Sequence, residues 1–278
     1  MTNRKALFFD IDGTILTPPP FSIPDSTRLG LKLARENGHL TFINTGRIFG
    51  LVPEEIKKMD FDGFVCGCGT QIYINGRQLF HSTLPHSLCA ETVAAMKRFR
   101  VPAIYEDGER LLYDSTSPVE APSAEIFRNL TCLQDISTLD PEEAKRYTFG
   151  KFLVQLIPES DRKGFLDFCN GHFVCFDHGH DTYEITQKSC TKASGIAFVL
   201  EQLGLSREDS YAFGDSSNDL DMLKFAGTSI AMGNSMKEIL PFCTYQTTDV
   251  DKDGILNALL YYGLIQKEQL PGNTANLR

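Results

Sequence analysis

Three short apolar runs, each followed at once by a polar cluster, constrain the fold of this chain more than any other feature of its sequence. The runs are KALFF (5–9), LTFI (40–43) and YAF (211–213), and the clusters that follow them are DIDGT (10–14), NTGR (44–47) and GDSSND (214–219). Such continuous apolar runs are typical of parallel strands that are buried on both faces. Because helical patterns separate the runs, we predict an α/β fold with a parallel sheet.

The helical patterns of this α/β part have apolar faces and recognisable ends. In the helix predicted over 25–37, Leu29, Leu33 and Ala34 share one face, and Gly38 follows where a helix commonly stops. Further helices are predicted at 53–59, 191–205, 218–227 and 253–262, and further strands at 62–69 and 228–234.

The middle of the chain has a different pattern of predicted elements, in which hairpins alternate with helices. Hairpin turns are predicted at Asn75-Gly76, Asp107-Gly108 and Gly179, helices at 87–99 and 161–169, and a strand at 151–157. This pattern favours an α+β unit with a largely antiparallel sheet, inserted into the α/β part. We therefore predict a core made of residues 1–82 and 185–278, with residues 83–184 as a separately packed insertion.

Composition excludes several classes of protein. The net charge of −9 argues against a basic face for nucleic acid or for an anionic membrane. No apolar run approaches the ~20 residues that span a bilayer, and the N-terminal residues do not resemble a signal peptide. The eight cysteines are scattered without a CxxC pair, which is typical of free thiols in a reducing compartment. We therefore expect a cytoplasmic protein.

The polar clusters should meet in space. In an open parallel sheet, ligands bind at the carboxyl ends of the strands, and this is where Asp10, Asp12, Thr45, Arg47 and Asp215 are predicted to lie. Carboxylate oxygens from Asp10 and Asp215 suit Mg²⁺, which keeps several waters and accepts a substrate phosphate. Any one aspartate alone could be a turn or cap residue, but that explanation does not account for three such clusters together.

This arrangement strongly resembles the haloacid dehalogenase superfamily over residues ~5–270. FFDIDGTIL (8–16) resembles its first motif, FINTGR (42–47) the second, KASG (192–195) the third and FGDSSND (213–219) the fourth. The long insertion and AMGNSMKEI (231–239) are similar to the Cof-type branch, which has a large α+β cap. The resemblance implies a Rossmann-like parallel-sheet core with this insertion as its cap domain.

The resemblance also implies a role for each residue of these motifs. Asp10 is the expected nucleophile and Asp12 the expected general acid/base, while Lys192 is expected to offset charge on Asp10 and on the phosphate. The expected catalytic set is Asp10, Asp12, Thr45 and Lys192. Substrate contacts are expected from Thr45, Gly46, Arg47, Lys192 and Asn218. The expected metal site consists of Asp10, Asp12 through its carbonyl, Asp215, Asn218 and Asp219, the last two completing its inner and second shells.

The implied activity is that of a Mg²⁺-dependent phosphatase. It would hydrolyse a small phosphorylated metabolite, in this superfamily branch usually a sugar phosphate, through a phospho-aspartyl intermediate at Asp10. An acidic residue at position 12 goes with phosphatases and mutases in this superfamily. Two alternatives stay open: a phosphosugar mutase, and a phospho-accepting switch without turnover. As partners we expect the small metabolite alone, with no nucleic acid and no membrane, in a monomer or weak homodimer.

Some positions depart from the motifs of the superfamily, and for others a second residue or a second role is possible. Lys188 competes with Lys192, although it lacks the small and apolar residues that follow Lys192. Cys68-Gly69-Thr70 stands where many Cof-type relatives have an Asn-Gly-Ala turn, which would remove or shift a polar contact near the site. His178 and His180 could bind a metal, line the substrate entrance or be ordinary polar residues of a hairpin.

Overall fold

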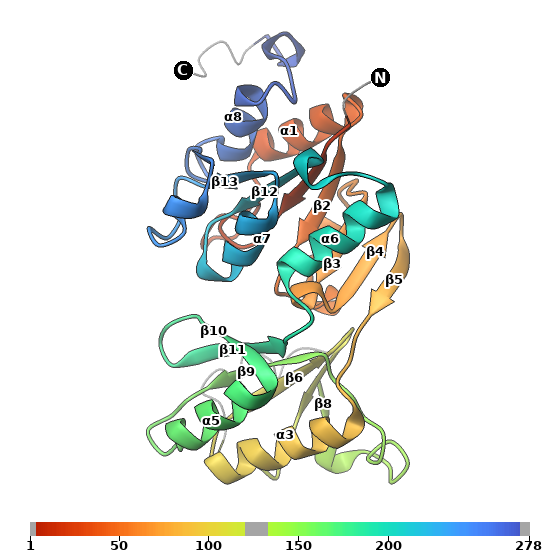
Figure 1. Ribbon diagram of the computed structural model, residues 1–278, viewed down its shortest axis with the longest axis vertical. Helices are drawn as coiled ribbons and strands as arrows, with labels where there is room; N and C mark the ends of the chain where they lie inside the picture. The colour runs from red at the N-terminus through yellow and green to blue at the C-terminus, as the bar shows by residue number, and fades with distance from the viewer. Residues whose placement is uncertain (1–3, 120–132, 273–278) are drawn as a thin grey trace.

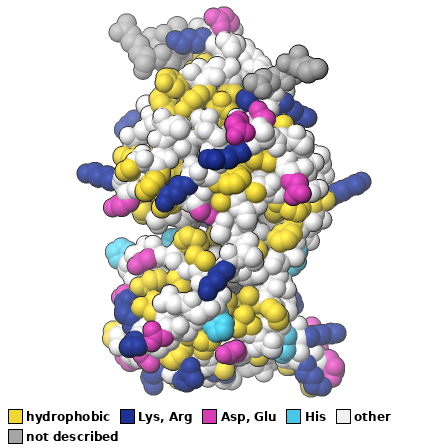
Figure 2. Space-filling view, viewed as in Figure 1, with side chains coloured by type: hydrophobic (Ala, Val, Ile, Leu, Met, Phe, Trp, Pro, Cys, Tyr) yellow, Lys and Arg dark blue, Asp and Glu magenta, His cyan; other side chains and the backbone are white. Residues whose placement is uncertain are grey.

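A computed structural model describes residues 4–119 and 133–272 of the chain. It contains two sheets, each with its own helices, arranged one above the other in Figure 1. Residues 120–132, inside the predicted insertion, lie outside the described ranges. Figure 2 shows two lobes separated by a narrower waist, with basic and acidic side chains interspersed over this face. Among the described helices, none combines the length and the apolar character that a membrane crossing requires.

The core sheet has eight strands in the order β14-β13-β12-β1-β2-β3-β4-β5. The strands from β14 to β3 are parallel, while β3, β4 and β5 are joined antiparallel. Their bounds are β1 Ala6–Phe9, β2 Leu40–Asn44, β3 Gly63–Cys66, β4 Gln71–Ile74, β5 Arg77–His81, β12 Ser210–Gly214, β13 Thr228–Ala231 and β14 Tyr245–Gln246.

Helices cover both faces of this sheet, as its continuously apolar strands require. Phe9 of β1 belongs to the apolar cluster shared with α1 (Asp25–Glu36) and α8 (Gly254–Tyr261). Its neighbour Phe8 belongs to the opposite cluster, shared with α6 (Lys192–Leu203) and α7 (Leu220–Phe225). Phe9 stacks on Phe213 and Phe8 on Phe42, with ring centroids 4.5 and 5.2 Å apart. These contacts pack β1 against its neighbours β2 and β12 in the middle of the sheet.

The second sheet has six strands in the order β10-β11-β9-β6-β7-β8, antiparallel except for the β7–β8 pair. Helices α3 and α5 pack on one face and share an apolar cluster with it that includes Met96, Phe152 and Phe165. The bounds are α3 His86–Phe99, β6 Ala103–Asp107, β7 Arg110–Tyr113, β8 Leu133–Asp135, β9 Lys151–Gln155, α5 Arg162–His172, β10 Phe173–Asp177 and β11 Thr182–Gln187. The predicted fold class, a parallel-sheet core with an inserted α+β unit, is confirmed.

Short helices complete the chain: α2 Glu54–Lys57, η1 Phe49–Leu51, η2 Gly67–Gly69, η3 Ile136–Thr138, η4 Arg207–Asp209, η5 Ser217–Asp219, η6 Leu240–Phe242 and η7 Lys267–Gln269. Several predicted elements differ in extent: the strands predicted over 151–157 and 228–234 end at Gln155 and Ala231, and the helix predicted over 161–169 continues to His172. The strand predicted over 62–69 ends at Cys66, because Gly67, Cys68 and Gly69 all have positive φ. The helix predicted over 218–227 begins as the tighter turn η5 and becomes α-helical at Leu220. Seven cysteines are free, and Cys132 lies outside the described residues.

Candidate active site

The predicted residues of three strand ends surround one cavity of about 520 Å³. The core wall of the cavity is lined by Asp10, Asp12, Thr45, Gly46, Arg47, Leu51, Ser216 and Asn218. Because β2, β1 and β12 lie side by side and run parallel, the residues that follow them are brought to one edge of the sheet. Pockets of this size commonly hold small molecules.

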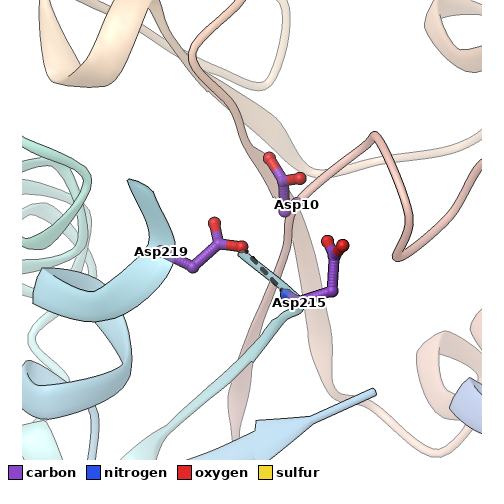
Figure 3. Close-up of side chains that lie close together, drawn as sticks. All are labelled: Asp10, Asp215 and Asp219. Atoms are coloured by element: carbon purple, nitrogen blue, oxygen red, sulfur yellow. Dashed lines mark hydrogen bonds between the residues drawn. The ribbon is translucent and has the colours of Figure 1, made fainter. Parts of the chain in front are cut away.

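Three aspartates come together beneath this wall. Asp10 follows β1, Asp215 follows β12, and Asp219 lies on η5; one carboxylate oxygen from each lies within 4.8 Å of the others (Figure 3). Gly13 makes the close approach possible. It has a φ of 81°, and a Cβ there would lie 2.3 Å from the carboxylate of Asp215. A side chain at position 13 would push Asp215 out of the group.

Lys192 is the buried cation of this group. Its Nζ donates to Asp10 Oδ1 at 2.7 Å and to Asp219 Oδ1 at 2.5 Å, and it lies 3.5 Å from Asn218 Oδ1. The side chain is only 1% exposed. Burial opposes its charge, but the facing carboxylates of Asp10 and Asp219 outweigh burial and raise the pKa of Lys192. Lys192 therefore stays charged beside Asp10.

The start of α6 places Lys192. Thr191 caps the helix: its Oγ1 accepts from the Ser194 amide at 3.1 Å, and its own amide donates to Ser194 Oγ at 2.9 Å. Asn44 Nδ2 donates to the Lys192 carbonyl at 3.0 Å, which ties the helix to the end of β2. The rival Lys188 is exposed and bonds to the carbonyls of Asn170 and Gly171. The structure thus brings Lys192, and not Lys188, to Asp10.

The Cys68-Gly69-Thr70 turn packs against this helix start. A Cβ on Gly69 would lie 2.4 Å from the Thr191 carbonyl oxygen, so glycine is needed there. Thr70 Oγ1 donates to the Gly67 carbonyl inside the turn at 2.9 Å, and none of the three residues lines the cavity. The turn supports the position of Thr191 and offers no side chain to the cavity.

Asp219 links the cation to the loop after β12. Its second oxygen, Oδ2, accepts from the amides of Asp215 and Ser216 at 2.9 and 3.1 Å. Both carboxylate oxygens of Asp219 are therefore engaged within the protein. Asp215 Oδ1 accepts from Thr14 Oγ1 at 3.2 Å, and Asn218 Oδ1 accepts from Ser216 Oγ at 2.8 Å.

The three carboxylates carry more negative charge than Lys192 balances. Burial raises the pKa of Asp10 to about 7; Lys192 acts against this increase, whereas the charges of Asp219 and Asp12 add to it. Burial and the charges of Asp219 and Asp10 raise the pKa of Asp215 to about 8. A divalent cation among these oxygens would offset the repulsion. The donor set of hard oxygens fits Mg²⁺.

Asp12 and Arg47 form an ion pair within the core wall of the cavity. Arg47 Nε donates to Asp12 Oδ2 at 2.8 Å and Nη2 donates to Oδ1 at 2.7 Å, a bidentate arrangement. This hydrogen bonding is the main reason that the pKa of Arg47 is raised. Thr45, which is 1% exposed, accepts from the Arg47 amide through Oγ1 at 3.2 Å. Both oxygens of Asp12 are therefore occupied by the residue that was predicted to contact substrate.

Apart from His178, which was one candidate for the substrate entrance, the residues of the opposite wall of the cavity were not predicted from the sequence. This wall is formed by the inserted sheet, from which Glu106, Lys151, Leu153, His178 and Glu184 line the cavity. Lys151 is the signal that sequence reasoning could have used, because it is a lone charge at the start of the apolar strand KFLVQ. Of the two histidines considered, His178 lies in this wall, whereas His180 sits at the exposed hairpin tip beside Asp181, which pairs with Arg162.

Charges on this wall are buried and paired. Burial alone would raise the pKa of Glu184, but the Lys151 charge and the His178 hydrogen bond outweigh it and lower the pKa. For Glu106, burial and the charge of Glu184 prevail over Lys151, and its pKa is raised. Burial opposes the charge of Lys151, yet its two carboxylate partners raise its pKa. Lys151 therefore forms ion pairs with both glutamates, but only for Glu184 is the net result a lowered pKa.

Replacing Lys192 by methionine should destabilise the protein strongly. The change would leave Asp10 and Asp219 without their cation, and breaking a buried ion pair from one side costs about 3–5 kcal/mol. Urea unfolding checks this. Lys188→Met is the matched control, since that side chain is exposed and a change of less than about 0.5 kcal/mol is expected. Equal free energies of unfolding for the two variants would show that Lys192 is not a structural counter-charge.

Comparison with known proteins identifies the family. Residues 7–259 match the haloacid dehalogenase-like hydrolases. The chain belongs to this family, as its motifs at Asp10, Thr45, Lys192 and Asp215 indicated. The expected enzyme class, a phosphatase of the haloacid dehalogenase type, is confirmed by the family match together with its relatives.

Individual relatives cover almost the whole chain. YkrA of Bacillus subtilis strain 168, whose name assigns it a phosphatase activity only provisionally, is 28% identical over 267 residues, covering 95% of this chain and 100% of YkrA. The pyridoxal phosphate phosphatase YbhA of Escherichia coli K12 is 27% identical over 254 residues, covering 84% of this chain and 89% of YbhA. Among solved structures, the subclass IIB sugar phosphatase BT4131 has a TM-score of 0.79 and 25% identity, covering 94% of this chain and 100% of that one.

Proposed function

We propose that this enzyme is a Mg²⁺-dependent phosphatase that hydrolyses a small phosphorylated metabolite, a sugar phosphate, through a phospho-aspartyl intermediate at Asp10. The observation that carries the proposal is the environment of Asp10. Its carboxylate is buried, lies 2.7 Å from Lys192 Nζ and belongs to a three-aspartate group at the foot of the cavity. A carboxylate approaches a phosphate dianion only when its charge is balanced, and Lys192 with a divalent cation provides that balance.

The residues divide the reaction into two steps. A carboxylate oxygen of Asp10 attacks phosphorus, so that a bond from Asp10 to phosphorus forms while the ester P–O bond breaks, and Asp12 protonates the leaving alcohol. Asp12 then takes a proton from water, whose oxygen attacks phosphorus, and phosphate leaves as the bond to Asp10 breaks. Thr45 Oγ1 and the Gly46 amide donate to the transferring oxygens, and Lys192 offsets charge in both steps.

Asp12 must leave Arg47 before it can act. In the structure Arg47 occupies both oxygens of Asp12, so the acid that protonates the leaving group is not yet available. A phosphate is an equally good bidentate partner for a guanidinium. We propose that the substrate phosphate binds the guanidinium of Arg47 in place of Asp12. We also propose that Asn218, which lines the same wall, contacts the substrate.

Asp10 and Asp215 would hold the metal through their carboxylates, and Asp12 through its backbone carbonyl. Asn218 and Asp219 would complete the site from its periphery, since both oxygens of Asp219 already bind Lys192 and backbone amides. The bound Mg²⁺ would polarise a phosphoryl oxygen and neutralise charge that develops there.

The inserted unit would act as a cap over this site. We propose its limits at residues 83–184, beginning just after β5 and ending within β11, the last strand of the inserted sheet, which continues to Gln187. The two chain segments that connect the cap to the core are hydrogen-bonded to each other. Ser82 Oγ donates to Gln187 Oε1 at 2.9 Å, and Gln187 Nε2 donates to the Ser82 carbonyl at 3.1 Å. Motion about this pair would open and close the cavity, which excludes water during the reaction.

Release of inorganic phosphate from a panel of phosphorylated metabolites tests the proposal. Sugar phosphates, pyridoxal phosphate and nucleotides should be compared with p-nitrophenyl phosphate, in Mg²⁺. Free phosphate from a sugar phosphate supports the proposal. An isomeric ester would identify a phosphosugar mutase, and phosphorylated Asp10 without turnover would identify a switch. We further propose a cytoplasmic monomer or weak homodimer that acts on small molecules and not on nucleic acid.

A further inference from the structure

We infer that Asn234 is a positioning residue for the metal site, because it holds the loop that carries Asp12 beside the loop that carries Asp215. Asn234 lies in AMGNSMKEI (231–239), a segment that resembles the Cof-type branch but has no part in the proposed reaction. Its side chain does not line the cavity, so it acts through other residues. This role rests on the proposed metal site and adds to it a residue that binds neither the cation nor the substrate.

The carboxamide of Asn234 joins two loops that are far apart in the sequence. Its Nδ2 donates to the Gly13 carbonyl at 2.8 Å, and its Oδ1 accepts from the Val250 amide at 2.9 Å. The turn that begins at Val250 is itself fastened to this segment, because the Gly233 amide donates to the Thr248 carbonyl at 2.9 Å. Both ends of the carboxamide are engaged, so its orientation is set and Nδ2 is directed at Gly13.

Gly13 is the point at which this bond affects the metal site. Its amide donates to the Leu16 carbonyl at 2.9 Å, and its carbonyl accepts from Asn234. Because glycine has no side chain to restrict its backbone, these bonds on either side help to set its conformation, with a φ of 81°. The peptide group before Gly13 contains the carbonyl of Asp12, the proposed metal ligand. Freedom at Gly13 would therefore move that ligand.

The same segment also holds Asp215. The Met236 amide donates to the Asp215 carbonyl at 2.8 Å. On its other side, the Asp215 carboxylate lies so close to Gly13 that a Cβ there would be 2.3 Å from Oδ2. Residues 232–236 thus bind Asp215 through the backbone and Gly13 through Asn234, which keeps the two loops at one spacing. Mg²⁺ requires near-ideal octahedral geometry, so its affinity should depend on this spacing.

The test measures Mg²⁺ affinity without relying on turnover. The melting temperature of Asn234→Ala should be recorded over a series of Mg²⁺ concentrations, since an ion that binds the folded state raises it according to its dissociation constant. We expect that constant to increase about 10-fold, the lower end of the range for residues that orient metal ligands. In EDTA the melting temperature should stay close to the parent's, because Asn234 is exposed. The Mg²⁺ concentration for half-maximal hydrolysis of p-nitrophenyl phosphate should increase by the same factor.

Two further variants separate the hydrogen bond from other effects of the change. Gln246→Ala is the matched control: this exposed side chain donates through Nε2 to the Gly233 carbonyl of the same segment at 3.4 Å, and not to Gly13. Its Mg²⁺ dissociation constant should equal the parent's. Asn234→Leu keeps the branched shape of the side chain and removes both hydrogen bonds. It should weaken Mg²⁺ binding as much as alanine does, and it serves if the alanine variant does not fold.

The outcomes distinguish the role of Asn234 from the metal site itself. If Mg²⁺ stabilises the unmodified protein and both Asn234 variants keep its dissociation constant, Asn234 is not a positioning residue and the metal site stands. Parent affinity in Asn234→Leu alone would attribute the alanine effect to lost volume and would equally contradict the role of the hydrogen bond. If Mg²⁺ does not stabilise the unmodified protein at any concentration, the proposed metal site is wrong.

Discussion

Replacing Asp10 by asparagine is expected to reduce phosphate release by about 10⁴-fold or more, the scale seen when a catalytic nucleophile is removed. Asparagine has nearly the volume of aspartate, but its amide is a poor nucleophile and a weaker metal ligand. The fold should survive, because the change removes one of three crowded carboxylates whose charges repel one another. Steady-state assays with p-nitrophenyl phosphate in Mg²⁺, together with thermal unfolding, measure both effects.

A substitution of Asp12, the expected general acid/base, separates loss of proton transfer from loss of the nucleophile. Asp12→Asn should also lose hydrolysis, but it keeps the nucleophile and should still become phosphorylated by an activated ester whose leaving group needs no proton. Substantial Mg²⁺-dependent turnover by Asp10→Asn would show that another group attacks phosphorus.

Removal of divalent metal should abolish turnover, and Mg²⁺ should restore it. Asp10 and Asp215 lie together with Asp219 in a group that Lys192 alone does not neutralise, so the phosphate dianion would meet uncompensated negative charge. Ca²⁺ should replace Mg²⁺ poorly, because it prefers six to eight oxygen ligands and a looser geometry. Activity should be measured after EDTA treatment and again after each ion is added back.

Thermal unfolding gives a readout of this site that does not depend on activity. Mg²⁺ should raise the melting temperature of the unmodified protein, because an ion that binds only the folded state stabilises it, and the increase should be smaller in Asp215→Asn. Full turnover in metal-free protein would contradict the role proposed for Asp215.

The core wall of the site could be predicted from sequence because strand direction determines where its residues meet. Asp10, Thr45 and Asp215 each follow an apolar strand, and parallel pairing of β2, β1 and β12 brings those three ends to one edge. Lys192 was harder to predict, since a lysine at a helix start is usually solvated. Its placement depends on the Thr191 cap and on the Gly69 approach.

The cap wall could not be predicted in the same way. Glu106, Lys151 and Glu184 lie on three strands of the inserted sheet, and they reach the cavity only because one face of that sheet turns toward the core. Local pattern indicates alternation along a strand, but it does not say what the polar face of an inserted unit covers. The Lys151 bond to the Gly46 carbonyl depends on how two separately packed units dock.

The pairing of Arg47 with Asp12 was also beyond sequence reasoning. Both residues were predicted at the site, one for substrate and one for proton transfer, and the structure joins them by two hydrogen bonds. Which partner Arg47 binds depends on the negative charges within its reach, and we propose that the substrate phosphate is one of them.

Trapping the acyl phosphate at Asp10 tests the central claim most directly. The enzyme should be mixed with a hydrolysed ester in Mg²⁺, quenched in acid during turnover, reduced with borohydride and digested for peptide mass spectrometry. We expect position 10 to be converted to homoserine in a fraction of the chains, and to stay aspartate when substrate or Mg²⁺ is omitted. Steady turnover with no modification at position 10, under conditions that trap a phospho-aspartyl standard, would contradict the covalent mechanism.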